Sequence, residues 1–439
     1  MIDLVVHNAV VVTADGAGSV HDRGGVAVAA GRLQAVGAEA EIAPLAERAA
    51  QRLDAGGMIL MPGLVNTHCH LASTLFRGLV EDLPLEPWLQ AVWKAEAAVL
   101  TPETSHLGAL LGLAELALGG VTTVADMWWH PDRAVQAARA IGMRIATGGI
   151  VFDFPGVTGD SVEARFDKAG RFLRDHAGAE DVIAAVLPHG AYTVAPENLI
   201  RARRLADRHG ALFSTHAAET RAENADIRNR YGNSVIRHLD RLGLLDGRTL
   251  LAHCVHPDAE EIEILARSGA HVAHNPVSNL KLASGIAPVP AMMAAGVPVS
   301  LGTDGAVSGN DLDMFLALRL AGMLHKGASG DAAAMPRSDL LRMATLQGAR
   351  ALGVADRIGS LEPGKAADMV LLATDRPHAV PLFDPVTHVV WSAVRSDVRD
   401  VFVAGRRIVA GGALTGADLD DILDRVRALA PKVRASLAD

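Results

Sequence analysis

Two histidines stand on either side of a cysteine in one short stretch of the sequence, as His68, Cys69 and His70. Side chains at positions i and i+2 of a strand point to the same face, so both imidazoles can reach one ion, whereas Cys69 should face the barrel wall. His216 and Asp304 end other apolar runs. The four side chains together offer nitrogen and oxygen ligands to a divalent ion such as zinc, which lowers the pKa of a bound water to near neutral.

Hydrolysis by such a water also needs groups that carry protons. Asp304 can take a proton from the water while it contacts the metal, and Glu219 can move a proton to the substrate and then to the leaving group. His253 can steady the attacking oxygen or the developing charge by hydrogen bonding. For Glu219, the alternative to proton transfer is a capping role at the start of the next helix. For each histidine, the alternative to metal binding is a structural role, which is common for a single histidine near a strand end.

The elements that must position these residues alternate between apolar strands and helical stretches, which is typical of a parallel sheet. Over roughly residues 60–350 they predict an α/β fold, a (β/α)8 barrel of the TIM type with its active site at the C-terminal strand ends. An open doubly wound sheet is the alternative, disfavoured because no GxGxxG loop follows a strand. The strand candidates are residues 58–68, 120–127, 143–151, 181–190, 211–219, 249–255, 270–276 and 297–305.

The residue pattern at both ends of the chain differs from that of the barrel region: short Val- and Ala-rich runs are separated by Gly and Asp turns. We expect residues 1–57 and 362–415 to form one small β-sandwich domain, with strands continuing through residues 386–412. Residues 58–361 should form the barrel, and residues 416–439 should form a C-terminal helix.

Composition limits the kind of partner. A net charge of −9 gives no reason to expect nucleic acid or an anionic membrane. No apolar run approaches the ~20 residues that a membrane span needs, and the N-terminus lacks the basic region of a signal peptide. Two cysteines cannot form a disulfide framework, which is consistent with a reducing cytoplasm. We therefore expect a cytoplasmic protein that acts on a small molecule.

Five motifs in order carry a family resemblance: PGLVNTHCH, THAAE, AHCVHPD, HNPVSNLKLASGIAPV and LGTDGA. Together they resemble the amidohydrolase superfamily and, more narrowly, the methylthioadenosine/S-adenosylhomocysteine deaminase family, which is related to the triazine hydrolases. The resemblance implies a barrel with a small β-sandwich. It also implies one divalent metal per chain, zinc first and Fe2+ or Mn2+ as other candidates, bound by the four side chains named above. Two-metal relatives carry a modified lysine at the end of strand four, and residues 181–190 contain none.

The resemblance also suggests residues that contact the substrate. It implies that His189 contacts the substrate and that Glu96 binds ribose hydroxyls. Without the resemblance, we would predict Glu96 to be a solvated helix residue. Trp88, with Trp93, Trp128 and Trp129, is a candidate for a flat apolar wall against a ring, with plain packing as the alternative. Asn275 and Ser278, which follow strand seven, are candidates for the pocket floor or for capping a loop.

The activity that the resemblance implies is that of a cyclic-amidine aminohydrolase, a hydrolase of C–N bonds other than peptide bonds. Relatives that take S-adenosylhomocysteine hold its tail with arginines in and after strand three, and residues 145–164 here hold none before Arg165. Methylthioadenosine, 5′-deoxyadenosine and adenosine are therefore favoured. The alternatives are an s-triazine dechlorinase or deaminase, a guanine or pterin deaminase, a two-metal hydrolase of cyclic amides, and a non-catalytic scaffold. The resemblance to the family also implies that the protein forms a homo-oligomer.

Overall fold

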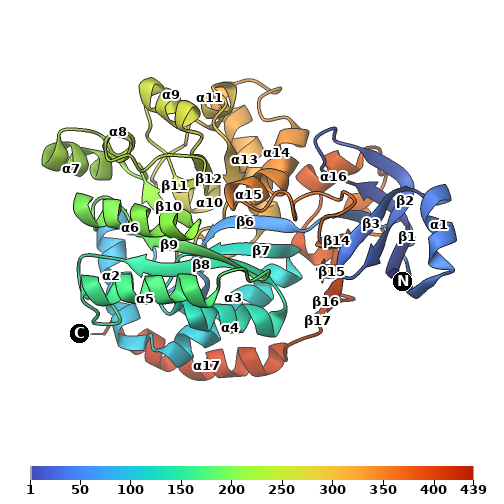
Figure 1. The fold of residues 1–439 in the computed structure, drawn as a ribbon, viewed down its shortest axis with the longest axis horizontal. Coiled ribbons are helices and arrows are strands. Elements are labelled where there is room, and N and C mark those ends of the chain that lie inside the picture. The colour runs from blue at the N-terminus through green and yellow to red at the C-terminus, as the bar shows by residue number, and fades with distance from the viewer. Residues whose placement is uncertain (1, 439) are drawn as a thin grey trace.

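The computed structural model describes residues 2–438, which form a parallel barrel and a separate sheet built from the two ends of the chain (Figure 1). The barrel has eight parallel strands in sequential order. This confirms the predicted α/β class and the (β/α)8 barrel. Its strands are β6 (Leu64–Cys69), β7 (Val121–Asp126), β8 (Arg144–Val151), β9 (Val182–Pro188), β10 (Leu212–Ala217), β11 (Thr249–His253), β12 (His271–His274) and β13 (Val299–Leu301).

Contacts between the last and first strands bring the two edges of the barrel together. The backbone N–H of Asp304 donates to the carbonyl of His68 at 3.0 Å. The Thr67 hydroxyl donates to the carbonyl of Leu301 at 2.8 Å. Every side chain of β6, β10 and β11 is buried, as expected of parallel strands covered on both faces. The ring therefore holds the carboxyl ends of all eight strands around one opening.

Helices surround the barrel, and several of them begin and end where the sequence supplies caps. At α9 the Asp258 side chain accepts from the backbone of Glu261 at 3.0 Å, and Glu261 accepts in return from the backbone of Asp258 at 2.9 Å. The helix ends at Gly269, whose φ of 72° suits glycine. The helices and 3-10 turns of the barrel region are η1 (Leu71–Phe76), α2 (Leu85–Val99), α3 (Pro102–Leu118), α4 (Pro131–Ile141), α5 (Val162–Asp175), α6 (Pro196–His209), α7 (Arg221–Tyr231), α8 (Val235–Arg241), α9 (Ala259–Ser268), α10 (Pro276–Lys281), α11 (Val289–Ala294), α12 (Ala306–Gly309), α13 (Met314–Ser329), α14 (Arg337–Met343) and α15 (Leu346–Ala351).

The terminal sheet joins strands from both ends of the chain, and in Figure 1 it lies to the right of the barrel. Its central strand β5 pairs in parallel with β1 and antiparallel with β14, which links the two halves. The strands are β1 (Ile2–Val12), β2 (Val20–Ala29), β3 (Arg32–Ala38), β4 (Ala49–Asp54), β5 (Ile59–Pro62), β14 (Met369–Leu372), β15 (Val398–Val403), β16 (Arg406–Ala410) and β17 (Ala413–Leu414), with α1 (Glu39–Ala46) and the turns η2 (Pro377–Ala379) and η3 (Arg395–Asp397).

The stretch 58–68, expected to be one barrel strand, supplies two strands in different sheets. Residues Ile59–Pro62 form β5 of the terminal sheet, and Leu64–Cys69 form β6 of the barrel. Gly63 lies between them, and a side chain there would collide with Thr122 on β7. The close approach of the two sheets at this point therefore requires glycine.

A second difference concerns residues 386–412, which were expected to be strands throughout. Residues Pro385–Trp391 form a helix, α16, rather than a strand. The Asp384 side chain caps this helix by accepting from the backbone N–H of Thr387, and Pro385 occupies the first helical position. These start signals override the β-branched residues that follow them.

A buried ion pair connects the barrel to the terminal sheet. The Arg144 guanidinium on β8 donates to Asp368 at 2.8 Å, and both side chains are nearly excluded from solvent. The same aspartate accepts from the backbone N–H of Ala404 at 2.7 Å, and Arg144 also donates to the carbonyl of Glu180 at 2.6 Å. One charged pair thus connects three segments at the base of the barrel.

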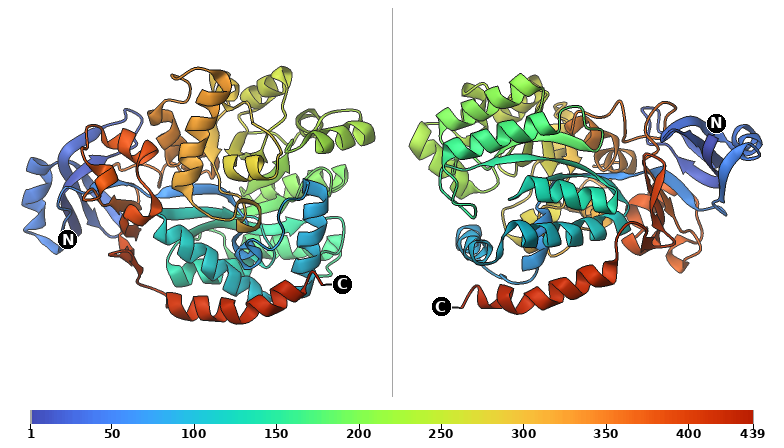
Figure 2. Two further views of the ribbon diagram at one scale, coloured as in Figure 1. Left: turned by 180° about the vertical axis from the view of Figure 1, so that it is seen from behind. Right: turned by 60° about the horizontal axis from the view of Figure 1, so that its bottom comes forward.

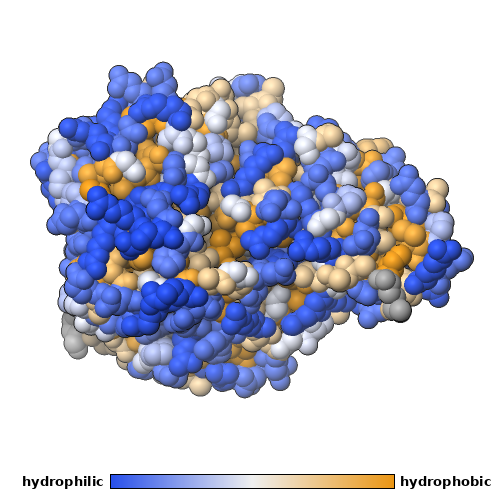
Figure 3. Space-filling model, in the orientation of Figure 1, coloured by the Kyte–Doolittle hydropathy of each residue, from blue (hydrophilic) through white to orange (hydrophobic). Residues whose placement is uncertain are grey.

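The last helix, α17 (Leu419–Ala435), runs along the outside of the barrel toward the C-terminus (Figure 2). Its Val433 is buried in an apolar cluster that includes Trp88 and Val92 of α2. The C-terminal helix therefore supports the outer face of α2. On the face drawn in Figure 3, hydrophilic side chains predominate, with smaller apolar areas among them. Within residues 2–438, none of the helices combines the length and hydropathy needed to cross a membrane.

Candidate metal centre and active site

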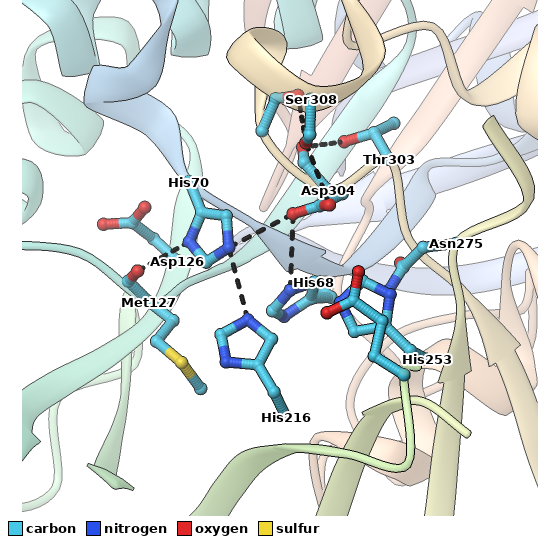
Figure 4. Close-up of polar contacts among 12 residues, drawn as sticks. His68, His70, Asp126, Met127, His216, His253, Asn275, Thr303, Asp304 and Ser308 are labelled. Carbon is cyan, nitrogen blue, oxygen red and sulfur yellow. Dashed lines mark hydrogen bonds and ion pairs between the residues drawn. The ribbon is translucent and has the colours of Figure 1, made fainter. Parts of the chain in front are cut away.

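Four side chains from the ends of three barrel strands, β6, β10 and β13, converge at the carboxyl end of the barrel (Figure 4). The Nε2 atoms of His68 and His70 lie 3.5 and 3.1 Å from the same carboxylate oxygen of Asp304. The Nε2 atom of His216 lies 3.4 Å from that of His70. The structure therefore brings together all four residues that the sequence proposed as metal ligands. Cys69 is fully buried and packs in the apolar core outside this group.

Hydrogen bonds on the far side of two rings orient their Nε2 atoms inward. His70 Nδ1 donates to the carbonyl of Met127 at 2.7 Å, and His216 Nδ1 donates to the carbonyl of His189 at 2.7 Å. In the neutral rings this leaves both Nε2 atoms as lone-pair donors that face each other. His68 Nε2 is buried and has no hydrogen-bond partner among the described residues. Bare nitrogen lone pairs around a carboxylate in a buried space fit a divalent cation.

Charge and burial keep His68 neutral and Asp304 ionised, the forms that bind metals. Burial lowers the pKa of His68 to about 4, so its ring stays neutral near pH 7. Burial would raise the pKa of Asp304, but the His68 and His70 rings beside its carboxylate hold that pKa well below its ordinary value. The second carboxylate oxygen accepts from the Ser308 hydroxyl at 2.9 Å. Asp304 also has a φ of 60°, a costly backbone conformation for a residue other than glycine.

Two further polar side chains lie beside this group. Glu219 is buried, its Oε1 accepts from the Ser284 hydroxyl at 3.2 Å, and its Oε2 lies 3.8 Å from His253 Nε2. Burial raises the pKa of Glu219, which favours the protonated form. His253 has a φ of 75°, and its Nδ1 lies 2.8 Å from the side-chain oxygen of Asn279. The geometry places a carboxyl and an imidazole together next to the four-residue cluster.

A pocket opens beside the cluster, and most of its wall is aromatic or aliphatic. Glu96 lies in this wall, 2% exposed, and its carboxylate accepts from the Trp129 indole N–H at 2.9 Å. Burial raises the pKa of Glu96 to about 7 despite that hydrogen bond. The lining residues are His70, Leu85, Trp88, Leu89, Val92, Trp93, Glu96, Met127, Trp128, Trp129, Ile150, Phe152, His189, Tyr192, His216, Glu219, His253, Leu282, Asp304, Val307 and Ser308.

Stacked rings form one continuous side of the pocket. Phe152 stacks on Trp129 at a centroid distance of 5.1 Å and on His189 at 4.5 Å. Trp128 lies 5.0 Å from the ring of His70. Such a surface suits a flat aromatic ligand, and the nearby carboxylates and imidazoles can bind its polar edge.

Arginine is absent from this pocket wall as far as the described residues extend. Arg165 is buried behind the wall, with its guanidinium over the rings of Trp129 and Phe152 at 5.3 and 5.8 Å. It donates to the carbonyls of Phe154 and Pro155. The guanidinium therefore supports the aromatic wall from outside, and the pocket offers no bidentate partner to a ligand carboxylate.

The structure places two of the residues named for the pocket floor elsewhere. Asn275 and Ser278 are fully buried and lie outside the pocket lining. The Asn275 amide nitrogen lies 3.4 Å from His253 Nδ1, which gives it a place behind the imidazole. Trp88, Glu96 and His189, by contrast, do line the pocket.

The sequence interpretation missed several residues of the site. Asp126 ends β7, and its carboxylate accepts from the backbone N–H of Leu71 at 2.8 Å, which holds the chain directly after His70. A signal was present, because Asp126 ends a strand as the other site residues do. Phe152, Tyr192 and Ser284 come from loops, and no spacing in the sequence marks them.

Comparisons with known proteins agree with this geometry. The model of the amidohydrolase family matches residues 59–408. The chain is 41% identical over 433 residues to a 5-methylthioadenosine/S-adenosylhomocysteine deaminase from Syntrophobacter fumaroxidans, covering 98% of both chains. It is 40% identical over 384 residues to a 5′-deoxyadenosine deaminase from Methanothermobacter thermautotrophicus, covering 87% of this chain and 89% of the relative. A zinc-bound adenosine deaminase structure from Xanthomonas campestris superposes with a TM-score of 0.96 at 37% identity, covering 99% of each chain.

Proposed function

Because the chain belongs to the amidohydrolase family, we propose that it is a metal-dependent deaminase that releases ammonia from the exocyclic amine of an adenosine-type nucleoside. One observation carries the proposal most directly. Three imidazole nitrogens and the Asp304 carboxylate converge next to Glu219, at the open end of an aromatic pocket. That arrangement provides metal ligands, a proton carrier and a surface for a flat ring in one place.

We propose that His68, His70, His216 and Asp304 bind one divalent ion. The unpartnered Nε2 of His68 and the facing nitrogens of His70 and His216 support this assignment. Zinc is the proposed metal, supported by the borderline-soft ligand set and by the zinc in the related adenosine deaminase structure. When bound, the ion supplies the Lewis acidity that makes a hydrolytic water nucleophilic near neutral pH.

The protein's own side chains then move the protons. The carboxyl of Glu219, whose pKa is raised by burial, gives its proton to a ring nitrogen, so that the neighbouring carbon becomes electrophilic. Asp304 accepts a proton from the attacking water, and His253 steadies the attacking oxygen by hydrogen bonding. The proton held by Asp304 passes to the amine, which leaves as ammonia, and the remaining proton of the added hydroxyl passes to Glu219 and restores its acid form. Water thus replaces the amino group, and the ring product carries a carbonyl.

The pocket supports a nucleoside whose 5′ substituent is short or apolar. Glu96 can accept hydrogen bonds from ribose hydroxyls, and the stacked rings of Trp129, Phe152 and His189 suit a purine face. The amino-acid tail of S-adenosylhomocysteine would lack a cationic partner, because Arg165 is buried behind the wall. Methylthioadenosine, 5′-deoxyadenosine and adenosine are therefore the proposed substrates.

A substrate panel tests this proposal. Ammonia release is measured from the three proposed nucleosides, S-adenosylhomocysteine, guanine, a pterin and an aminated s-triazine, with the zinc-loaded full-length protein. We expect turnover of the adenosine derivatives and a much lower kcat/KM for S-adenosylhomocysteine. Failure to release ammonia from any adenosine derivative would refute the proposal. Two bound metals per chain, measured by elemental analysis, would instead favour hydrolysis of a cyclic amide. Glu219→Gln should lower the kcat for ammonia release about 100- to 10,000-fold while the metal content stays unchanged.

A further inference from the structure

The segment that connects His216 to Glu219 makes a sharp turn that depends on contacts from outside it. Ala218 has a φ of 50°, a conformation that side-chain-bearing residues rarely adopt. On one side of the turn, the carbonyls of Ala217 and Ala218 accept from the backbone N–H groups of Cys254 and Val255 at 3.0 and 2.9 Å. On the other side, the backbone N–H of Glu219 needs an acceptor of its own.

Glu223 supplies that acceptor. Its Oε2 atom accepts from the Glu219 backbone N–H at 2.7 Å, and its side chain is more than nine-tenths buried. Glu223 stands in the first turn of α7, whose start is capped by the hydroxyl of Thr220 at 3.0 Å. The glutamate therefore reaches back from the helix to the residue that we propose as the proton carrier.

One oxygen of this buried carboxyl is left without a hydrogen-bond partner. The Oε1 atom of Glu223 is buried and has no hydrogen-bond partner among residues 2–438. Burying a half-satisfied carboxyl is costly, and here burial also raises its pKa to about 7. A carboxyl with both oxygens solvated or hydrogen-bonded would cap the helix at lower cost, so the unpartnered oxygen suggests a second role.

Two contacts hold Glu219 in its position. Glu223 binds the backbone N–H, and the Ser284 hydroxyl binds Oε1 of the side chain at 3.2 Å. The remaining oxygen, Oε2, then lies 3.8 Å from His253 Nε2 at the pocket wall. A shift of the turn would move this oxygen away from both the imidazole and the substrate ring.

We propose that Glu223 is a positioning residue, which acts through the backbone of Glu219 to set the direction of its carboxyl. The inference rests on the proposed function, since it gives Glu219 the proton-transfer step. Glu223 itself does not contact the substrate; the pocket lining includes Glu219 and Tyr192 but not Glu223.

The chain contains a matched control in Glu261. This glutamate also stands in the first turn of a barrel helix, α9, is 2% exposed, and accepts from a backbone N–H, that of Asp258, at 2.9 Å. It lies outside the pocket lining. The other oxygen of Glu261 accepts from the Ser234 hydroxyl and lies 3.3 Å from Arg237. Loss of Glu261 therefore removes the same kind of helix cap together with these contacts, away from Glu219.

The experiment compares E223A, E223Q and E261A as full-length, zinc-loaded proteins, with ammonia release from 5′-deoxyadenosine as the assay. We expect E223A to lower kcat about 10- to 100-fold, as is typical for a small misplacement of a reacting group, with little change in KM or metal content. E223Q keeps an oxygen that can accept from the Glu219 N–H, and it should restore most of the lost kcat. E261A should lower thermal stability and leave kcat unchanged. If E223A does not fold, Glu223→Asp, whose carboxylate is one methylene shorter, replaces it.

A double-mutant cycle and a crystal structure separate this role from a purely structural one. In the E219Q background, adding E223A should lower the residual kcat no further, because the two residues act as one unit. The crystal structure of E223A should show the Glu219 carboxyl displaced, a readout that does not depend on the substrate. The inference is overturned if E223A behaves like E261A, if E223Q is as impaired as E223A, if the E223A effect persists in E219Q, or if Glu219 keeps its position. Absence of ammonia release by the wild-type protein would refute the proposed function alone.

Discussion

Replacing Trp129 by Phe should change the pH at which the enzyme binds its substrate. The indole N–H of Trp129 donates to Glu96 at 2.9 Å, and burial already raises the pKa of that carboxyl to about 7. Phenylalanine keeps the ring that stacks on Phe152 but removes the hydrogen bond. The charged form of Glu96, which we propose accepts the ribose hydroxyls, then loses its main stabilising contact.

The size of the change follows from that one hydrogen bond. A hydrogen bond to a charged group contributes about 1.5–3 kcal/mol, and about 1.4 kcal/mol corresponds to one pKa unit. Its loss should therefore raise the pKa of Glu96 from about 7 to about 8 or 9. Because the productive form is the carboxylate, binding is present above this pKa and is lost as the pH falls through it. At pH 7 the kcat/KM of W129F should fall about 5- to 50-fold, with recovery at high pH.

The assay is the pH profile of kcat/KM for 5′-deoxyadenosine, which reports the ionisations of the free enzyme and substrate. Trp88→Phe is the matched control, since Trp88 lines the same pocket but its indole nitrogen has no hydrogen-bond partner among the described residues. The acid limb of W88F should stay where it is in the wild type. An acid limb of W129F that overlays the wild-type limb would refute the assignment of Glu96 as the ionising group.

Three further outcomes are expected. Arg144→Met leaves Asp368 buried without its partner and should lower the free energy of unfolding in urea by about 3–5 kcal/mol; a loss below about 1 kcal/mol would contradict the burial of this pair. Exhaustive chelation should abolish ammonia release, and added zinc should restore it; full activity with no metal detected would exclude the proposed centre. Cys69 and Cys254 are fully buried and burial raises the pKa of both thiols, so a thiol reagent should label neither until denaturant is added. Rapid labelling of the native protein would show that the barrel opens readily.

The strand-end residues could be predicted from the sequence because parallel strands leave little freedom in where their ends lie. A polar residue that ends such a strand must stand at the shared carboxyl edge, which is why His68, His216 and Asp304 meet. The same rule would have found Asp126, which ends β7, although its contact is with the backbone of Leu71 and not with the metal ligands.

The hydrogen-bond partners of these residues could not be predicted in the same way. The contact of Trp129 with Glu96 joins a strand-end loop to a helix, and that of Ser284 with Glu219 joins two loops. Such pairs depend on how loops pack, and no period in the sequence encodes that packing. The run 386–391 shows a further limit, since its β-branched residues favoured a strand while the cap at Asp384 produced a helix.

The split origin of the terminal sheet has a consequence for the order of events during synthesis. Its central strand β5 is translated early, but its antiparallel partner β14 begins only at Met369. On the ribosome, β5 therefore has one open edge until most of the chain has emerged, and closing so long a loop is slow. Because only Gly63 separates β5 from β6, the strand that carries His68 and ends just before His70, we expect the active site to form only after β14 has docked on β5.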